Sequence, residues 1–120
     1  MEVRTAASPR DVKHYTTDRL REEFLIQNLF VPGEIKMVYS HIDRIITGAA
    51  VPAEEALVLT AGAELRAEYF LQRREMGIIN IGGAGVIVAD GKEYEVGHKE
   101  GMYIGMGVKD ITFSSKESAE

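Results

Sequence analysis

The chain has 120 residues, of which 45% are hydrophobic and 28% are charged, and its net charge is -5. This length and composition are typical of one globular domain. Because the charge is negative and no basic run is longer than Arg73-Arg74, we expect neither nucleic acid nor an acidic membrane surface as a partner. The absence of cysteine excludes disulfides, thiolate catalysis and cysteine-ligated zinc. No secretory signal opens the chain and no apolar run approaches the ~20 residues of a membrane span, so we expect a cytoplasmic protein.

Residues 1–30 are predicted to form an extended lead-in followed by a short helix. Residues 1–16 have no regular apolar pattern and are expected to be extended. Thr17 or Asp18 is expected to cap a helix over Arg19–Gln27, whose apolar residues fall on one face.

Residues 31–115 are predicted to form a β-barrel domain, because short apolar or alternating runs are separated there by Gly, Pro or Asp. Short strands at spacings of about 8–12 residues favour a sandwich or barrel over alternating α/β units. Asp90-Gly91 predicts a tight hairpin, since both central positions of such a turn need positive φ. Residues 116–120 are expected to be a polar tail. The expected strands are Lys36–Tyr39, Arg44–Gly48, Ala56–Leu59, Leu65–Leu71, Gly77–Ile81, Gly85–Ala89, Glu93–Val96, Met102–Ile104 and Asp110–Ser114.

Two stretches resemble the sequence frames of cupins, which are small jelly rolls made of two sheets. In the first frame, two histidines and a glutamate lie between two glycines at fixed intervals and bind a metal inside the barrel. Gly62, Glu75 and Gly82 stand at these intervals, but the histidine positions fall on Glu68 and Phe70. A shorter histidine-to-glutamate spacing supplies no imidazole either.

The second cupin frame resembles residues 100–114. Gly105 and Gly107 stand at its proline and glycine positions, and Asp110 stands at its histidine position. The glycine and apolar pattern of the barrel is therefore kept without the metal-binding histidines. We expect an all-β, cupin-like double-stranded β-helix (jelly-roll) barrel with a short N-terminal helix.

The missing histidines decide the expected metal chemistry. A catalytic first-row metal needs about three side-chain ligands, usually including imidazole, so we expect no metal or other cofactor in this chain. An all-carboxylate site of Glu68, Glu75 and Asp110 is the alternative. Otherwise Glu75 is expected to pair with Arg73, Arg74 or a tyrosine.

The densest group of polar residues is Tyr39–Arg44. Alternation along a strand places Tyr39, His41 and Asp43 on one face, and Arg44 follows them. A general base, an orienting carboxylate and a cation for a substrate carboxylate could come from this group. The alternative is a polar corner that ties strands together or contacts a neighbouring subunit.

A second polar run is Gln72–Glu75, where Arg74 is the candidate to contact an anion. The alternative is an ion-pair network at a strand end or interface. The other two histidines, His14 and His98, lie in the lead-in and in a loop, at separations unlike those of metal ligands.

Three long strings resemble the 5-dehydro-4-deoxy-D-glucuronate isomerases, also called 4-deoxy-L-threo-5-hexosulose-uronate ketol-isomerases. They are Met37–Ile46, Tyr69–Gly85 and Asp90–His98, and with Glu22–Leu25 the similarity covers nearly the whole chain. The resemblance implies a zinc-dependent, oligomeric enzyme of two cupin-like halves. It would interconvert an aldehyde-bearing uronate and its ketose isomer, 3-deoxy-D-glycero-2,5-hexodiulosonate, during pectin breakdown.

The resemblance places these residues in the N-terminal half, whereas the zinc ligands of the family lie in the C-terminal half. It implies a structural half without the zinc that would stabilise the oxyanion of the enediol. The implied partners are the C-terminal cupin half and neighbours in a homo-oligomer, with a sugar-acid substrate in the complete enzyme. Two alternatives are a stand-alone, metal-free cupin that binds a sugar acid and a purely architectural oligomerisation domain.

Overall fold

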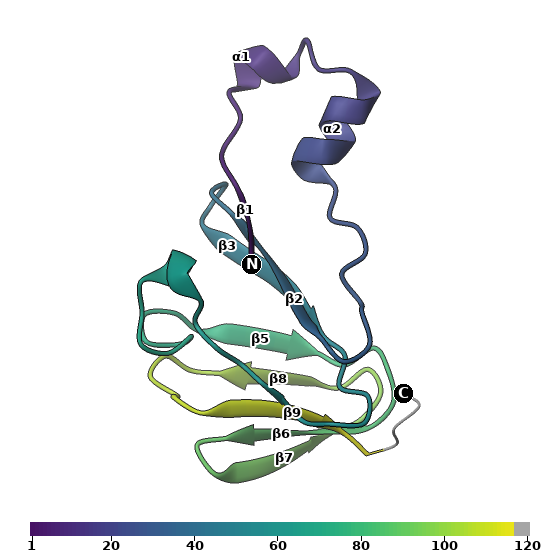
Figure 1. Cartoon of the computed structure of the whole chain (residues 1–120), viewed down its shortest axis with the longest axis vertical. Helices are drawn as coiled ribbons and strands as arrows, with labels where there is room; N and C mark the ends of the chain where they lie inside the picture. Colours follow the sequence, from purple (N-terminus) through teal and green to yellow (C-terminus); the bar gives the residue numbers. More distant parts are fainter. Residues whose placement is uncertain (117–120) are drawn as a thin grey trace.

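The computed structural model describes residues 1–116 and consists mainly of β-strands. Within this range the strands form three sheets, in the orders β1-β2-β3, β4-β9-β6-β7 and β5-β8 (Figure 1). The strands are β1 (Glu2–Arg4), β2 (Ile35–Ser40), β3 (Ile45–Ala50), β4 (Leu57–Val58), β5 (Met76–Ile79), β6 (Gly85–Ala89), β7 (Lys92–Val96), β8 (Gly101–Ile104) and β9 (Ile111–Ser115). The all-β class is confirmed, but the sheets of the described residues do not close into a barrel.

The start of the chain contains a strand and a helix that the sequence did not predict. β1 pairs in parallel with β2, and α1 (Pro9–Val12) begins at a proline, whose fixed φ suits the first helical position. The side chain of Ser8 caps α1 by accepting a hydrogen bond from the N–H of Arg10. The extended conformation expected for residues 1–16 agrees with β1 but is wrong for α1, because a local cap and proline suffice to start a helical turn.

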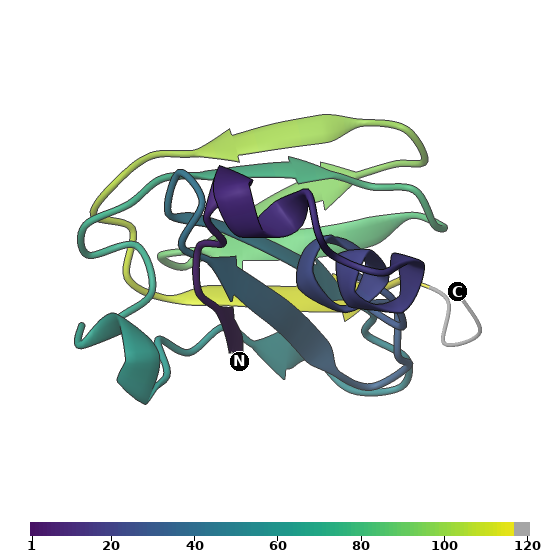
Figure 2. The ribbon, with the colours of Figure 1, turned by 90° about the horizontal axis from the view of Figure 1, so that it is seen from above.

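The predicted helix is α2 (Thr17–Phe24), which begins and ends earlier than expected. Its cap is Thr16, whose Oγ1 accepts a hydrogen bond from the N–H of Arg19, and not Thr17 or Asp18. Neither helix buries a residue. Residues 5–30 are here called the N-terminal arm. Its helices project beyond the first sheet along the long axis of the molecule, the segment after α2 returns beside that sheet, and the view from above places both helices over it (Figures 1 and 2).

The hairpin at Asp90-Gly91 is confirmed. The two residues have φ of 47° and 82°, and Ala89 pairs with Lys92 on either side of them. Asp90 Oδ1 also accepts hydrogen bonds from the backbone N–H groups of Lys109 (3.0 Å) and Asp110 (2.8 Å). The turn therefore also fixes the point at which the chain enters β9.

The strand expected over Leu65–Leu71 is wrong. The segment starts with a 3-10 turn, η1 (Ala63–Leu65), and continues through turns and bends. Arg66 is left-handed with φ 48°, and the Arg73 guanidinium donates to the carbonyls of Leu65 (3.1 Å) and Arg66 (2.7 Å). These bonds satisfy carbonyls that a strand would pair, so the apolar residues of this run anchor an irregular loop to the core.

The hydrophobic core lies between the second sheet, this loop and the third sheet, whose β8 supplies Ile104. Leu71 and Ile111 are its most buried members, with exposed fractions of 0% and 1%. The remaining members are Leu59, Ala61, Leu65, Phe70, Ile87, Val96 and Ile104. β2 and β3 pack only partly buried side chains, such as Met37 and Ile46, against this core, and the buried Val38 of β2 lies outside it. The first sheet is therefore incompletely packed against the other two.

Of the expected polar tail, only Lys116 lies within the described residues, and residues 117–120 lie outside them. Lys116 is exposed, and its Nζ lies 2.6 Å from Glu95 Oε1. Among residues 1–116, no helix has the length and apolar character needed to cross a membrane.

Candidate functional site

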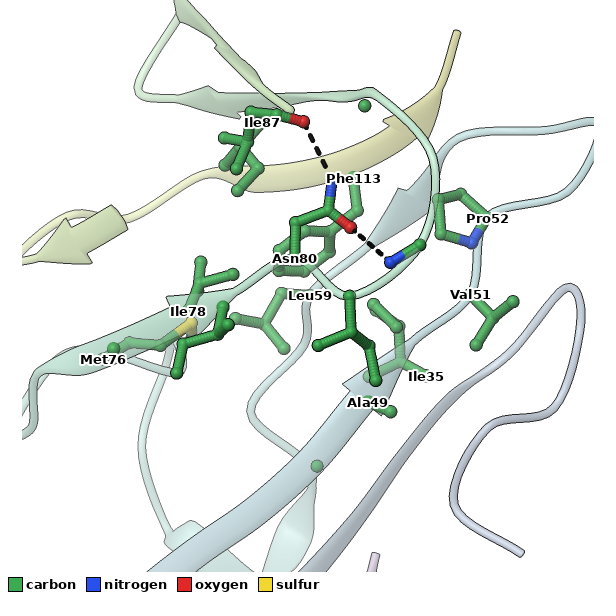
Figure 3. Close-up of a pocket in the computed structure, with 18 of the residues that line it drawn as sticks. Ile35, Ala49, Val51, Pro52, Leu59, Met76, Ile78, Asn80, Ile87 and Phe113 are labelled. Atoms are coloured by element: carbon green, nitrogen blue, oxygen red, sulfur yellow. Dashed lines mark hydrogen bonds between the residues drawn. The ribbon is translucent and has the colours of Figure 1, made fainter. Parts of the chain in front are cut away.

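A cleft of about 1030 Å³ separates β3 from β5. Its walls are mostly apolar side chains of these two strands, with the core residues Leu59 and Ile87 and the partly buried Phe113 behind them (Figure 3). Residues 82–86 and the end of β9 line the end of the cleft toward which β3 and β5 run. Arg44, which precedes β3, and Arg74, which precedes β5, also line it.

Asn80 is the polar residue that organises one end of the cleft. Its Nδ2 donates hydrogen bonds to the carbonyls of Gly83 (2.8 Å) and Val96 (2.9 Å), and its Oδ1 accepts one from the N–H of Gly82 (3.0 Å). Figure 3 shows the side chain in this position beside the loop. Because donor and acceptor are both engaged, Asn80 holds the loop against β5 and β7.

Three candidate residues come together near the start of β5. The ring centroids of Tyr39 and His41 are 5.0 Å apart. The Arg74 guanidinium lies 5.7 Å from the Tyr39 ring centroid and 5.8 Å from that of Phe70. Among the described residues no carboxylate forms an ion pair with Arg74. Its charge is therefore stabilised by aromatic faces and can still pair with an anion.

Asp43 and Arg44 do not join this group by strand alternation. β2 ends at Ser40, whose Oγ accepts a hydrogen bond from the N–H of Ile42, and Asp43 and Arg44 are left-handed, with φ of 55° and 52°. The expected common face of Tyr39, His41 and Asp43 is therefore wrong at Asp43, because a turn replaces the strand there. Arg44 is placed in the wall of the cleft instead.

Glu75 pairs with a tyrosine, one of the partners expected for it. Tyr103 donates its hydroxyl hydrogen to Glu75 Oε2 over 2.6 Å. This hydrogen bond is the main cause that raises the pKa of Tyr103 above its usual value, and desolvation and the negative charge of Glu75 act in the same direction. Glu75, which stands at the glutamate position of the first cupin sequence frame, thus links the start of β5 to β8.

The ion-pair network expected for Gln72–Glu75 is absent from residues 1–116. The ion pairs found there are Arg4–Glu2, Arg19–Glu23 and Lys116–Glu95. Arg73 instead bonds backbone carbonyls, and the Oε1 of Gln72 accepts a hydrogen bond from the N–H of Glu68. This run is therefore held by hydrogen bonds to the main chain.

The described residues do not fit the zinc ion that the sequence resemblance implies for the whole enzyme. No three His, Asp or Glu side chains of residues 1–116 gather into a group that could hold a metal, which removes the alternative site of Glu68, Glu75 and Asp110. The Nδ1 of His98 lies 2.9 Å from the carbonyl of Gly82, and His14 follows α1 in the arm.

Sequence reasoning missed Asn80 and Tyr103. The signal for Asn80 was present, because an amide two residues before the glycine-rich stretch Gly82–Gly85 is placed to bond its free backbone groups. Tyr103 carried no such signal. Its contact with Glu75 depends on the pairing of Gly77 with Tyr103 across β5 and β8.

The fold and the cleft define an all-β domain whose sheets leave an apolar opening between β3 and β5. No family model matches the chain. It is 74% identical over 98% of its length to the 4-deoxy-L-threo-5-hexosulose-uronate ketol-isomerase of Lachnoclostridium phytofermentans. Proteins of the same name from Lachnospira eligens and Halalkalibacterium halodurans are 56% and 54% identical over 100% and 99% of the chain.

In all three comparisons the chain covers 43% of the relative. The chain thus spans less than half the length of the curated relatives that it matches. The resemblance seen in the sequence is confirmed, and the chain is homologous to a part of the 4-deoxy-L-threo-5-hexosulose-uronate ketol-isomerases.

Proposed function

We propose that this chain forms the N-terminal, structural domain of a ketol-isomerase. The whole enzyme would interconvert 5-dehydro-4-deoxy-D-glucuronate and 3-deoxy-D-glycero-2,5-hexodiulosonate in the cytoplasm, as a step of pectin and uronate breakdown. The observation that carries the proposal is the 74% identity over 98% of the chain to a protein of that name.

The roles that we propose for the two halves of the enzyme follow from the chemistry of ketol isomerisation. Moving a proton between adjacent carbons needs a base and an electrophile that stabilises the developing oxyanion. The donor groups of residues 1–116 do not fit a zinc ion, so we assign zinc to the C-terminal half. The role of this domain is then to hold that half and its neighbours in place.

We further propose that the domain is a cupin-type jelly roll. The hairpin of β6 and β7, with β9 returning to pair with β6, supports a Greek-key arrangement, in which a later strand lies beside an earlier one. The pairing of β4 with β9 extends the same sheet to four strands. Jelly rolls are built from two such sheets.

The proposed partners are the C-terminal cupin half and neighbouring subunits. The chain has an accessible surface of 8328 Å², against about 6,500 Å² for a compact monomer of its mass. The chain therefore exposes about 1,800 Å² more than a compact monomer does. One side of a standard protein interface covers about 800 Å², so the excess is enough for a stable contact.

The shape of the chain supports the same proposal. Its radius of gyration is 15.9 Å, whereas a compact domain of this length has about 13.6 Å. The N-terminal arm leaves Phe24 and Phe30 exposed, at 45% and 61%. Exposed apolar side chains on a projecting arm favour contact with a partner.

The test is reconstitution. The chain is expressed with the remainder of the Lachnoclostridium phytofermentans isomerase, and conversion of 5-dehydro-4-deoxy-D-glucuronate is measured in the presence of zinc. We expect activity from the pair and none from the chain alone. Turnover by the chain alone would contradict a purely structural role, and an inactive pair that does associate would contradict the proposed reaction.

A stand-alone module that binds a sugar acid is the second candidate, supported by Arg74, which has no ion-pair partner among the described residues. Calorimetric titration of the chain with the substrate distinguishes the two. A structural domain is expected to give no heat of binding, whereas saturable binding that is lost in Arg74→Ala favours the binding module.

A further inference from the structure

β3 and β5 each have one edge without a neighbouring strand. Among the described residues β3 pairs only with β2, and β5 pairs only with β8. The free edges of both strands face the cleft, since residues of both line it. Unpaired strand edges bind further strands readily, and these edges flank one opening.

Backbone groups of β3 point into the opening. Val51 donates a hydrogen bond to the carbonyl of Glu34 at 3.1 Å, so residue 51 belongs to a bonded pair of the β2–β3 ladder. Bonded and non-bonded pairs alternate along antiparallel strands. It follows that Ile46, Gly48 and Ala50 direct their N–H and C=O groups away from β2, toward the cleft.

The same reasoning applies to β5. Asn80 donates to the carbonyl of Glu100 at 2.9 Å, so residues 76 and 78 bond to β8 while Gly77 and Ile79 direct their backbone groups to the cleft. Ile45 and Ile79 are also exposed, at 58% and 75%. Both edges thus offer hydrogen-bonding groups beside uncovered apolar side chains.

The directions of the strands define what fits between them. β3 and β5 both run toward the end of the cleft that residues 82–86 line (Figure 1). A strand running the opposite way would be antiparallel to both, as in every other strand pair of the described chain except β1 with β2. Such a strand would join the first and third sheets into one.

The end of β9 lies where that strand would start. Ser114 and Ser115 line the cleft, and the N–H of Lys116 donates to the carbonyl of Ala84 at 3.0 Å. A segment that follows β9 therefore reaches the cleft at the end where β3 and β5 finish, and it can run back between them.

We propose that the cleft receives one β-strand, supplied by the segment that follows β9 in the longer ketol-isomerase relatives. This inference rests on the proposed function. The polar residues 117–120 directly follow Lys116 in the sequence, and beyond them the strand is apolar where it covers Ile45, Ile79 and the core residues behind them. It ends near Arg44 and Arg74, which precede β3 and β5, so an acidic residue near its C-terminal end complements these two cations.

With this strand in place, the molecule has two facing sheets. One has the order β1-β2-β3, the added strand, β5 and β8, and the other is the existing sheet β4-β9-β6-β7. The cleft is then the position of a structural strand, and a small ligand has no place in it.

A synthetic peptide tests the proposal. Its sequence is that of the ~12 residues, about 40 Å when extended, that follow the residue aligned with Lys116 in the Lachnoclostridium phytofermentans isomerase. We expect saturable binding by fluorescence anisotropy, and hydrogen exchange at Ile46, Ala50 and Ile79 slowed by at least about tenfold. A scrambled peptide is the control and should do neither. Binding that leaves these amides unprotected would overturn the proposal.

Two variants separate backbone pairing from side-chain contact. Ile79→Pro removes the N–H that faces the cleft and leaves the β8 ladder intact, whereas Ile79→Ala keeps that N–H. We expect the proline variant to bind the peptide at least about tenfold more weakly than the alanine variant. Equal affinities would contradict strand addition. The circular dichroism spectra of both variants establish that they are folded.

A second copy of the chain is the competing occupant. If the free chain is a dimer in which Ile46, Ala50 and Ile79 are already protected from exchange, the strand comes from that copy and the proposal is wrong. The reconstituted isomerase separates the two proposals, because activity reports on the proposed function whether or not the peptide binds.

Discussion

Replacing Asn80 with alanine should loosen the end of the cleft where β5, the glycine-rich loop and β7 meet. The change removes the two hydrogen bonds donated to Gly83 and Val96 and the one accepted from Gly82. Each such bond contributes about 0.5–1.5 kcal/mol, and Asn80 is only half-buried, so water replaces part of the loss. We expect the free energy of unfolding to fall by about 2 kcal/mol.

Urea unfolding followed by circular dichroism measures this loss. Gln27→Ala is the matched control, because it removes an exposed amide from the N-terminal arm and should change stability by less than about 0.5 kcal/mol. A loss for Asn80→Ala no larger than that of the control would refute the argument that this side chain holds the loop.

Asn80→Asp is a more specific test, because it removes the side-chain N–H donors and keeps an oxygen that can accept a hydrogen bond. At neutral pH the carboxylate can still accept from Gly82, but it faces the carbonyls of Gly83 and Val96 and cannot donate to them. These carbonyls favour the protonated acid, which raises the folded-state pKa above the unfolded one. The stability of this variant relative to Asn80→Ala should therefore be greatest at low pH and fall as the pH rises.

Three further outcomes are expected. Leu71→Ala, at a residue with 0% exposure, should cost about 2–5 kcal/mol in urea unfolding. The raised pKa of Tyr103 stabilises the fold below pH 10 and loses that effect as the pH rises through the folded-state pKa. Ultraviolet difference titration should therefore give one late-titrating tyrosine that is missing in Tyr103→Phe and ordinary in Glu75→Gln. Exposed apolar surface and unpaired strand edges should make the chain a dimer or larger in light scattering over a tenfold concentration range, with Tyr39–Arg44 or Tyr69–Glu75 in the contact. A monomer of 13.3 kDa throughout would contradict this.

The sequence predicted those features that depend on neighbouring residues. The hairpin at Asp90-Gly91 follows from the φ values that the two residues tolerate, and β6 has the predicted bounds, Gly85–Ala89. The strand predicted over Leu65–Leu71 is absent, because the apolar residues of this run are buried in the core without forming the alternating pattern of a strand. A short apolar run does not by itself show whether its residues belong to a strand or to an irregular segment that is buried in the core.

The site was predictable only in part, for a related reason. Tyr39, His41 and Arg74 were recognised as polar candidates, but the approach of Arg74 to Tyr39 joins segments far apart in sequence. Asp43 was misplaced because the alternation of a strand was extended past Ser40, although aspartate tolerates the left-handed φ of 55° found there. Contacts between distant strands depend on sheet order, which one sequence does not reveal.

The parallel strand β1 has a practical consequence for handling this protein. Met1 packs against the hydrophobic core, β1 covers the outer edge of β2, and the Arg4 guanidinium donates to the carbonyls of Glu23 (3.3 Å) and Leu25 (2.8 Å) at the end of α2. Removing the first four residues, or fusing an affinity tag directly to Met1, would expose the edge of β2 to aggregation. It would also break the hydrogen bonds that hold the N-terminal arm. A tag at this end is better joined through a spacer that is long enough to leave Met1 packed against the core.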